Sequence, residues 1–398
     1  MKILIFYEQF SWGGVDKYLV ELINNWPNNK DELIIVTNEN NVGFNKIKKT
    51  FKRKSIKYFF FNSYSYTFIC NIFNNNKLSF FIYFLYIFQP ILLILTTIKF
   101  IFFLKGHKKI NNIFSVNGAY PASWANISII FAAKILKIKK RVMGVHHEAS
   151  SPSLIIKPYH YFIDKMLSKS LTDLVCVSKA TLKTIKKSRY LNHKNFKNKV
   201  IHNDLKLSPQ DLKKKLFIKL KSKYFLLGIL GRVESYKGHE DVLYAISQLQ
   251  SRYRNKIKLL IIGAYEPKNY KYLMNLSEKL KVQDSIIFTG YLSCNSHTII
   301  NSLDAVIMAT RDFEGFGYTA LEAVKIGKPL ITTNLEAIKE FINPDFVQMV
   351  NPGDRNNISE KIKSLLKNTE IHKKTSNKYK KILKKEFQMS KDYRSIFI

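Results

Sequence analysis

Cysteine is scarce in this 398-residue sequence. Its three cysteines (Cys70, Cys176 and Cys294) are odd in number, lie far apart and show no metal-ligand spacing. This pattern argues against a disulfide framework or a zinc site, and it is typical of a protein from a reducing cytoplasm. The apolar stretch between Lys2 and Glu8 is too short for the core of a secretory signal. We therefore interpret it as a first buried strand.

Acidic residues are also scarce. The chain has 65 lysines and arginines against 29 acidic residues, a net charge of +36. The electrostatic field of so many positive charges favours an anionic partner: nucleic acid, an anionic membrane surface or an anionic nucleotide ligand. Part of the excess has a simpler source, because abundant Lys, Asn, Ile and Phe are typical of an A/T-rich genome. With 46% apolar residues, the chain can bury a core and is not disordered by composition.

Short apolar runs alternate with stretches of helical periodicity along the whole chain, which predicts parallel sheets covered by helices on both faces. The fold class is therefore α/β, with two tandem Rossmann-like, doubly wound domains. We expect an N-terminal domain over 1–205, a lysine-rich linker over 206–222, a C-terminal domain over 223–375 and a final helix over 376–398. Ligands of such sheets bind at the carboxyl ends of the strands, here in a cleft between the domains.

Residues 80–104 are apolar and aromatic over a length of ~20 residues, which is enough for a helix to span a bilayer. The strands predicted on either side of this segment belong to one sheet, and a span would place the two parts of that sheet on opposite sides of the membrane. A buried or membrane-surface helix is therefore favoured. The lysines beside the segment indicate peripheral attachment to an anionic leaflet.

The most specific motif contains Glu314 and Glu322, which flank the letters GFGYTAL. Gly317 permits a backbone turn into a helix that we expect to start near Tyr318 or Thr319. A helix N-terminus carries free N–H donors and a positive dipole end, which suit a phosphate. An ionised carboxylate only accepts hydrogen bonds, so two of them suit the hydroxyls of a sugar or ribose. The simpler alternative is a helix-capping glutamate.

A second motif, GRVESYKG, follows a strand that we expect to end at Leu230. Gly231 frees the turn, and Arg232 and Lys237 lie in the loop that leads to the next helix. A guanidinium and an ammonium at a strand's carboxyl end would neutralise the charge that grows on a diphosphate leaving group. Either cation alone is explained equally well as an exposed surface residue.

Together these motifs resemble the retaining glycosyltransferases of the GT-B fold, specifically glycosyltransferase family 4. The family's G-R-x4-K-G is similar to GRVESYKG, and its E-x7-E is similar to the stretch from Glu314 to Glu322. Weaker similarities follow in the same order over most of the chain: WGGVDKYLVEL, RVMGVHH, VCVSKATLKTI, an altered VIHNDL, IIFTGY and IGKPLITT. The last helix of GT-B proteins commonly crosses back onto the N-terminal domain, which assigns that role to FQMSKDYRSIF.

The resemblance implies roles for individual residues of the donor site. Arg232 and Lys237 would bind the donor diphosphate, Glu322 the ribose hydroxyls, and Glu314, as a catalytic residue, the donor sugar. The resemblance also adds a set of donor-binding residues that would act mainly through their backbone: Gly13, Gly14, Gly290, Phe316, Gly317, Tyr318 and Thr319.

A histidine that ends a strand of the N-terminal domain would lie near the reacting sugar. His146 is favoured over His147 because it directly follows RVMGV, and a satisfied histidine at a strand end is the simpler alternative. No metal or other cofactor is expected, because the family typically needs no divalent ion and the sequence has no D-x-D where a metal–diphosphate site would need it.

The implied function is transfer of a sugar, with retention, from a UDP- or GDP-sugar to a hydroxyl of a glycan or lipid-linked acceptor. The implied setting is bacterial polysaccharide or lipopolysaccharide synthesis, on the inner face of the cytoplasmic membrane. The alternatives are another GT-B enzyme, such as a nucleotide-sugar epimerase or a phosphorylase-like protein, a catalytically dead membrane-bound scaffold, and a basic nucleic-acid-binding protein. The last is disfavoured because no recognisable nucleic-acid module is present.

Overall fold

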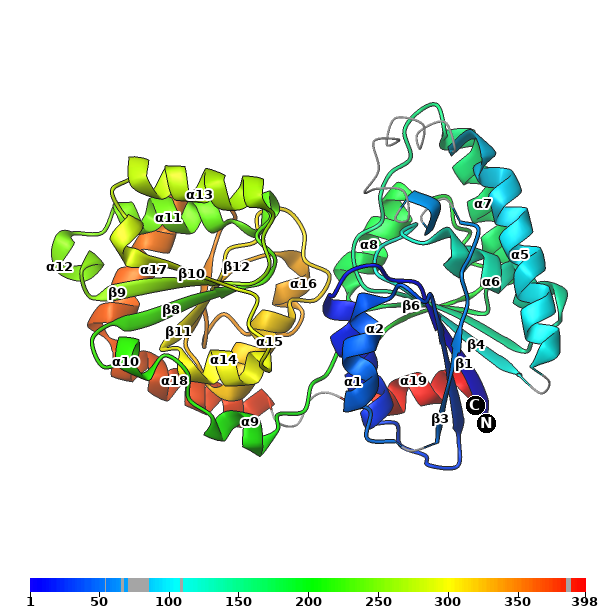
Figure 1. The fold of residues 1–398 in the computed structure, drawn as a ribbon, viewed down its shortest axis with the longest axis horizontal. Helices are drawn as coiled ribbons and strands as arrows, with labels where there is room; N and C mark the ends of the chain where they lie inside the picture. The colour runs from blue at the N-terminus through cyan, green and yellow to red at the C-terminus, as the bar shows by residue number, and fades with distance from the viewer. Residues whose placement is uncertain (54, 66–67, 71–85, 108–109, 384–387) are drawn as a thin grey trace. The chain divides into compact units, whose positions relative to one another are not determined.

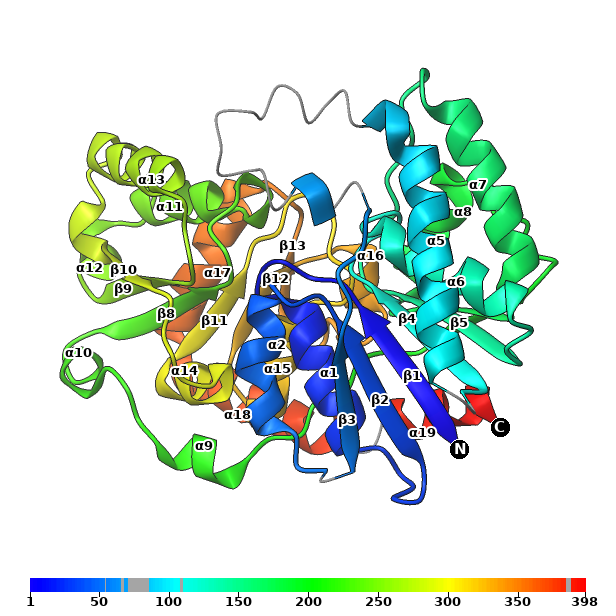
Figure 2. The same cartoon turned by 45° about the vertical axis from the view of Figure 1, so that its right-hand side comes forward.

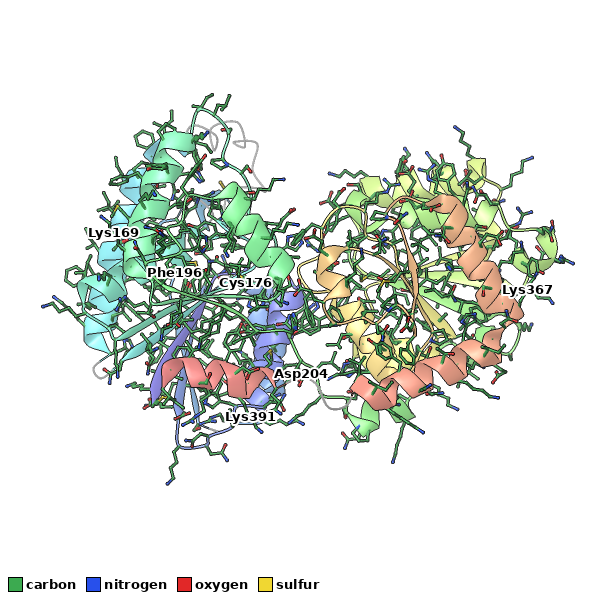
Figure 3. All side chains as sticks on the ribbon, turned by 180° about the vertical axis from the view of Figure 1, so that it is seen from behind. Lys169, Cys176, Phe196, Asp204, Lys367 and Lys391 are labelled. Carbon is green, nitrogen blue, oxygen red and sulfur yellow. The ribbon has the colours of Figure 1, made fainter. Side chains whose placement is uncertain are left out.

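The structure is a computed structural model that describes residues 1–398 except 54, 66–67, 71–85, 108–109 and 384–387 (Figure 1). The described residues divide into two compact units. Unit 1 comprises Met1–Asp204 together with Gln388–Ile398, and unit 2 comprises Leu205–Phe387. The chain therefore leaves unit 1 after Asp204, which Figure 3 labels, and returns to it at its C-terminal end.

Within its described residues, unit 1 is built on a seven-stranded parallel sheet with the order β3-β2-β1-β4-β5-β6-β7. The strands are apolar and mostly buried, as expected for parallel strands covered on both faces. Their bounds are β1 (Lys2–Tyr7), β2 (Glu32–Thr37), β3 (Ile56–Phe60), β4 (Asn112–Asn117), β5 (Lys140–Val145), β6 (Asp173–Cys176) and β7 (Lys197–Val200).

Helices cover both faces of this sheet. The side chains of Leu4 and Phe6 share a core cluster with α5 and α6, whereas α1 and α19 pack together on the opposite face, where Tyr393 contacts Tyr18 and Phe114. The helices are α1 (Gly14–Asn24), α2 (Val42–Ile47), η1 (Lys48–Thr50), η2 (Tyr86–Phe88), α5 (Gln89–Gly106), α6 (Trp124–Ile135), α7 (Lys157–Ser170), α8 (Lys179–Ser188) and α19 (Met389–Phe397).

The described part of unit 2 contains a six-stranded parallel sheet with the order β10-β9-β8-β11-β12-β13. Its strands are β8 (Phe225–Leu230), β9 (Ile257–Ile262), β10 (Ile286–Gly290), β11 (Ala305–Met308), β12 (Leu330–Thr333) and β13 (Gln348–Val350). Its helices are α9 (Pro209–Lys213), α10 (Ile218–Lys221), η3 (Ser235–Lys237), α11 (His239–Ser247), α12 (Ser251–Arg254), α13 (Pro267–Lys279), η4 (Gln283–Ser285), α14 (Ser296–Ser302), α15 (Tyr318–Ile326), α16 (Glu336–Lys339), α17 (Arg355–Lys367) and α18 (Thr369–Leu383).

The predicted fold class, two doubly wound α/β sheets in tandem, is confirmed. Two segments differ in detail from the prediction. The lysine-rich stretch 206–222 is part of unit 2, where it forms α9 and α10 and where the backbone N–H of Leu216 donates to Ser302 Oγ at 2.8 Å. The stretch 376–398 is not one helix, because α18 belongs to unit 2 and α19 to unit 1.

Candidate functional site

The two motifs singled out in the C-terminal half meet at one edge of the unit 2 sheet. Strands β8 and β11 are neighbours and parallel, so the loops that follow them start at the same edge. Lys237 lies in the loop after β8 and Glu314 in the loop after β11. Lys237 Nζ donates to Glu314 Oε2 at 2.8 Å, and both side chains are partly exposed. An ammonium and a carboxylate thus stand together where a ligand of this sheet would bind.

Backbone contacts hold these two loops against each other. Gly238 adopts a φ of +72°, and a Cβ added there would lie 1.9 Å from the carbonyl oxygen of Ala309. Only glycine allows this approach without strain. The backbone N–H of Arg311 also donates to the carbonyl oxygen of Tyr236 at 2.7 Å. The positions of Lys237 and Glu314 are therefore set by the packing of their loops as well as by their own ion pair.

A buried carboxylate fixes the base of the loop that carries Glu314. Arg311 donates two hydrogen bonds of 2.6 Å to the two oxygens of Asp241, and Arg355 Nε donates to the same carboxylate at 2.9 Å. Burial alone would raise the pKa of Asp241, but the bonds from Arg311 and Arg355 outweigh it and lower this pKa below its ordinary value. The sequence analysis missed this network, because its members lie in three separate segments.

The two cations that we predicted to share a diphosphate contact different carboxylates. Arg232 Nη1 lies 3.0 Å from Glu234 Oε1, within the same loop, and the Arg232 side chain is 56% exposed. Lys237 instead contacts Glu314. Each cation thus has a carboxylate partner of its own in this structure.

The glycine-rich insert shapes the start of α15 as expected. Gly317 caps the helix with a φ of +86°, and a Cβ there would lie 2.4 Å from Ile338 Cδ1. Phe316 is buried and stacks on Phe341 with ring centroids 4.4 Å apart, so it anchors the turn. Tyr318 and Thr319 are the first two residues of α15, at the end where a helix presents N–H groups and a positive dipole.

Glu322 lies in α15 and is buried, with its carboxylate directed at the start of α14. Ser296 Oγ donates to Glu322 Oε1 at 2.7 Å, and His297 Nε2 lies 3.7 Å from the same oxygen. The sequence analysis predicted Glu322 but missed both α14 residues. The signal that could have found them is the polar run CNSHT, which follows a strand ending at Gly290, where φ is +66°.

In unit 1, the predicted glycine loop leads directly into α1. Gly13 caps this helix, Gly14 is its first residue, and the Gly13 N–H donates to Asp16 Oδ2 at 2.8 Å. Asp16 is fully buried, and burial raises the pKa of its carboxyl to about 7, although the hydrogen bond from Gly13 acts in the opposite direction. The buried carboxyl group of Asp16 thus holds the glycine loop through the backbone of Gly13.

His146 follows β5, and its backbone N–H donates to the carbonyl oxygens of Asn117 and Gly118. Its imidazole packs on the ring of Tyr18 in α1, with centroids 4.0 Å apart. Both ring nitrogens are buried and lack a hydrogen-bond partner among the described residues. Burial lowers the pKa of His146 to about 3, so the ring is neutral at physiological pH. His146 rather than His147 was the predicted catalytic histidine, and here its ring is directed at α1.

The candidate residues therefore form one group in each unit. The unit 1 group contains Gly13, Gly14 and His146, and the other predicted residues lie in unit 2 at the carboxyl edge of its sheet. Within the described ranges, no group of three or more His, Cys, Asp or Glu side chains is placed to hold a metal ion.

Known proteins share parts of this sequence and its overall fold. Residues 210–382 match the family described as "Glycosyl transferases group 1". The capsular polysaccharide biosynthesis glycosyltransferase CapM of Staphylococcus aureus is 24% identical over 248 residues, which cover 58% of this chain and 63% of CapM. The match thus spans less than two thirds of that relative's length.

Two solved structures have the same fold over the full chain. One is Anabaena Alr3699/HepE in complex with UDP and glucose, with a TM-score of 0.71 and 14% identity, covering 100% of this chain and 99% of that one. The other is a glycosyltransferase from Rickettsia africae, with a TM-score of 0.72 and 19% identity, covering 100% and 98%. Residues 210–382 thus match the group 1 glycosyl transferases, and the chain as a whole shares the fold of these solved structures, the GT-B fold.

Proposed function

We propose that this protein is a retaining glycosyltransferase that transfers a sugar from a nucleotide diphosphate donor to a hydroxyl acceptor. The observation that carries the proposal is the 2.8 Å contact between Lys237 and Glu314 at the carboxyl edge of the unit 2 sheet. It joins a diphosphate-binding cation to a hydroxyl-binding carboxylate. The match of residues 210–382 to the group 1 glycosyl transferases, and the UDP held by HepE, support the same chemistry.

In the proposed donor site, Lys237 and Arg232 neutralise the diphosphate and the N-terminus of α15 receives phosphate or sugar oxygens. Glu314 accepts hydrogen bonds from the donor sugar, and Glu322 accepts them from the ribose. Arg232 is largely exposed and pairs with Glu234 of its own loop, so turning toward a diphosphate costs it little. The site supplies positive charge from side chains, and the proposal therefore includes no metal ion.

The proposed reaction breaks the bond between the anomeric carbon and the diphosphate oxygen. The acceptor hydroxyl oxygen forms a new bond to the same face of that carbon, which retains the configuration. The leaving phosphate oxygen takes the hydroxyl proton. Lys237 and Arg232 stabilise the negative charge that develops on the diphosphate, an electrostatic role that needs no proton transfer from the protein.

The proposed acceptor is a glycan or a lipid-linked glycan in bacterial cell-surface polysaccharide synthesis. This part of the proposal is supported by CapM, a relative that is named for capsular polysaccharide biosynthesis. We place acceptor recognition in unit 1. For His146, whose neutral ring packs on Tyr18 of α1, we propose a role in shaping the acceptor side of unit 1.

A thermal-shift screen in EDTA tests the donor site. The purified chain is heated with UDP, GDP, ADP and their sugars, and a ligand at 100 times its dissociation constant should add ~2.7 kcal/mol of stability. We expect a shift with one nucleoside diphosphate, and its loss in Glu322→Ala. The matched control is Glu266→Ala, which removes an exposed carboxylate of the same unit and should leave the shift intact. No shift with any nucleotide would overturn the proposal.

A further inference from the structure

Helix α5, with η2 before it, has one face in the core of unit 1 and one face in solvent. Leu93, Phe100 and Leu104 belong to the buried core cluster. On the other side, Ile87 and Phe102 are 72% and 69% exposed. Single exposed apolar residues are ordinary, but a row of them along one helix marks an interaction surface.

A second exposed apolar row lies on α7 and the loop before it. Leu154 and Ile155 are 85% and 92% exposed, and Phe162 is exposed one turn into the helix. Tyr86 Oη lies 2.7 Å from His160 Nε2, which joins the start of α5 to α7. Figures 1 and 2 both show α5 and α7 side by side on the outside of unit 1. We refer to the exposed apolar residues of 87–102 and 154–166 together as the α5–α7 face.

The α5–α7 face lies beside the edge of the sheet where unit 1 carries its candidate residues. Ile155 belongs to the loop between β5 and α7, and this loop begins with His146 at the carboxyl end of β5. The loop that carries Ile155 thus starts at the carboxyl edge at which parallel α/β sheets bind their substrates.

Tyr86–Gly106 is long and apolar enough to cross a membrane, yet only a third of it is buried in the protein. The packing of the described residues argues against a crossing by this helix. Strands β3 and β4, which precede and follow α5 in the chain, belong to the same sheet. A crossing would also pull Phe100 and Leu104 out of the core. The apolar length is thus explained by a helix that lies along a surface, with one face in protein.

The exposed charges of helices α5 and α7 have one sign. Lys105 on α5 and Lys157 and Lys169 on α7 are exposed, and Figure 3 labels Lys169. Helix α5 contains no acidic residue. The acid of α7, Asp164, is buried in an ion pair with Arg189 and offers no negative charge to a partner. The net charge of +36 adds a long-range attraction to the same kind of partner.

We propose that the α5–α7 face docks on an anionic lipid surface, with its apolar side chains in the acyl boundary and its lysines at the headgroups. A second copy of this chain fits less well, because it would bring two lysine-bearing faces together. Lipid offers both an apolar layer and negative charge, which are the two properties that the face requires.

Vesicle flotation tests the docking. The full chain is mixed with vesicles of phosphatidylcholine alone or with 30% phosphatidylglycerol, a composition about as anionic as membranes that bind basic segments. We expect flotation with the anionic vesicles, weaker flotation with the neutral ones, and a decrease with salt. The double variant Leu154→Gln/Ile155→Gln should weaken partition roughly tenfold, since both side chains are exposed in the free protein.

The matched control is Ile371→Gln, which replaces an apolar residue of α18 that is 63% exposed and lies in unit 2. It should float like the unaltered chain. The proposal is overturned if the chain stays with the soluble fraction in both mixtures, or if Leu154→Gln/Ile155→Gln floats as well as Ile371→Gln. It is also overturned if sedimentation without lipid shows a dimer that the double variant loses.

Discussion

Lys237 and Glu314 are 77 residues apart in the sequence, and their side chains meet at 2.8 Å at the edge of one sheet. We expect Lys237→Ala to reduce turnover ~10²-fold or more, because it removes a preorganised cation from the leaving diphosphate. Steady-state kinetics with the nucleotide sugar identified in the thermal screen provide the measurement. Near-normal turnover would remove Lys237 from the donor site.

The control for this prediction is Lys268→Ala. Lys268 also pairs with a glutamate of unit 2, at 2.9 Å from Glu266, but this pair is exposed at the start of α13. Exposed ion pairs contribute little, so its loss should change neither turnover nor stability by a measurable amount.

Ser296 should act as a positioning residue for Glu322. We expect Ser296→Ala to raise the KM for the donor roughly tenfold with little change in kcat, since one hydrogen bond to a charged group is lost in ground state and transition state alike. Ser222→Ala, which removes an exposed hydroxyl of the same unit, is the control. A fall in kcat at constant KM would contradict the positioning role.

Asp241 should contribute to stability by holding Arg311 and Arg355 together. We expect Asp241→Asn to lower the free energy of unfolding by roughly 2 kcal/mol, because the charge that both guanidiniums contact is removed while the volume is kept. Urea denaturation checks this value, with the exposed Asp284→Asn as the comparison. Equal stability of the two variants would argue against the network.

Much of the fold could be predicted because parallel strands that are buried on both faces have continuous apolar sequences, such as LIIV within β2. The motif loops could be placed because each follows a predicted strand and contains a glycine, Gly231 or Gly317, at its turn. The contacts could not be predicted. Ser296 meets Glu322 only through the packing of α14 on α15, and the inward orientation of His146 depends on Tyr18 from another helix.

The buried carboxylate of Asp31 makes the stability of the folded protein depend on pH. Burial alone would raise its pKa, but bonds from Arg394, the Met1 ammonium and Trp26 lower it to about 2. Because the folded pKa lies below the unfolded one, the carboxylate contributes stability above about pH 4 and loses it as the pH falls toward 2. A pKa lowered to this extent corresponds to about 2 kcal/mol of stability.

We therefore expect the difference in melting temperature between the unaltered chain and Asp31→Asn to be constant above about pH 5 and to shrink between pH 4 and pH 2. Melting curves recorded by circular dichroism over this range check it. A difference that grows as the pH falls would mean that Asp31 is not held as an anion in the folded state.

Unit 1 is closed by α19, which the chain supplies only after the whole of unit 2. During synthesis the ribosome releases the described strands of unit 1 first, yet Tyr393 reaches Tyr18 and Phe114 only after α19 has left the exit tunnel. Unit 2 is contiguous in sequence and can fold while it emerges. The half of the molecule that is made first is therefore finished last, and in the interval the apolar surface beneath α19 is open to chaperones.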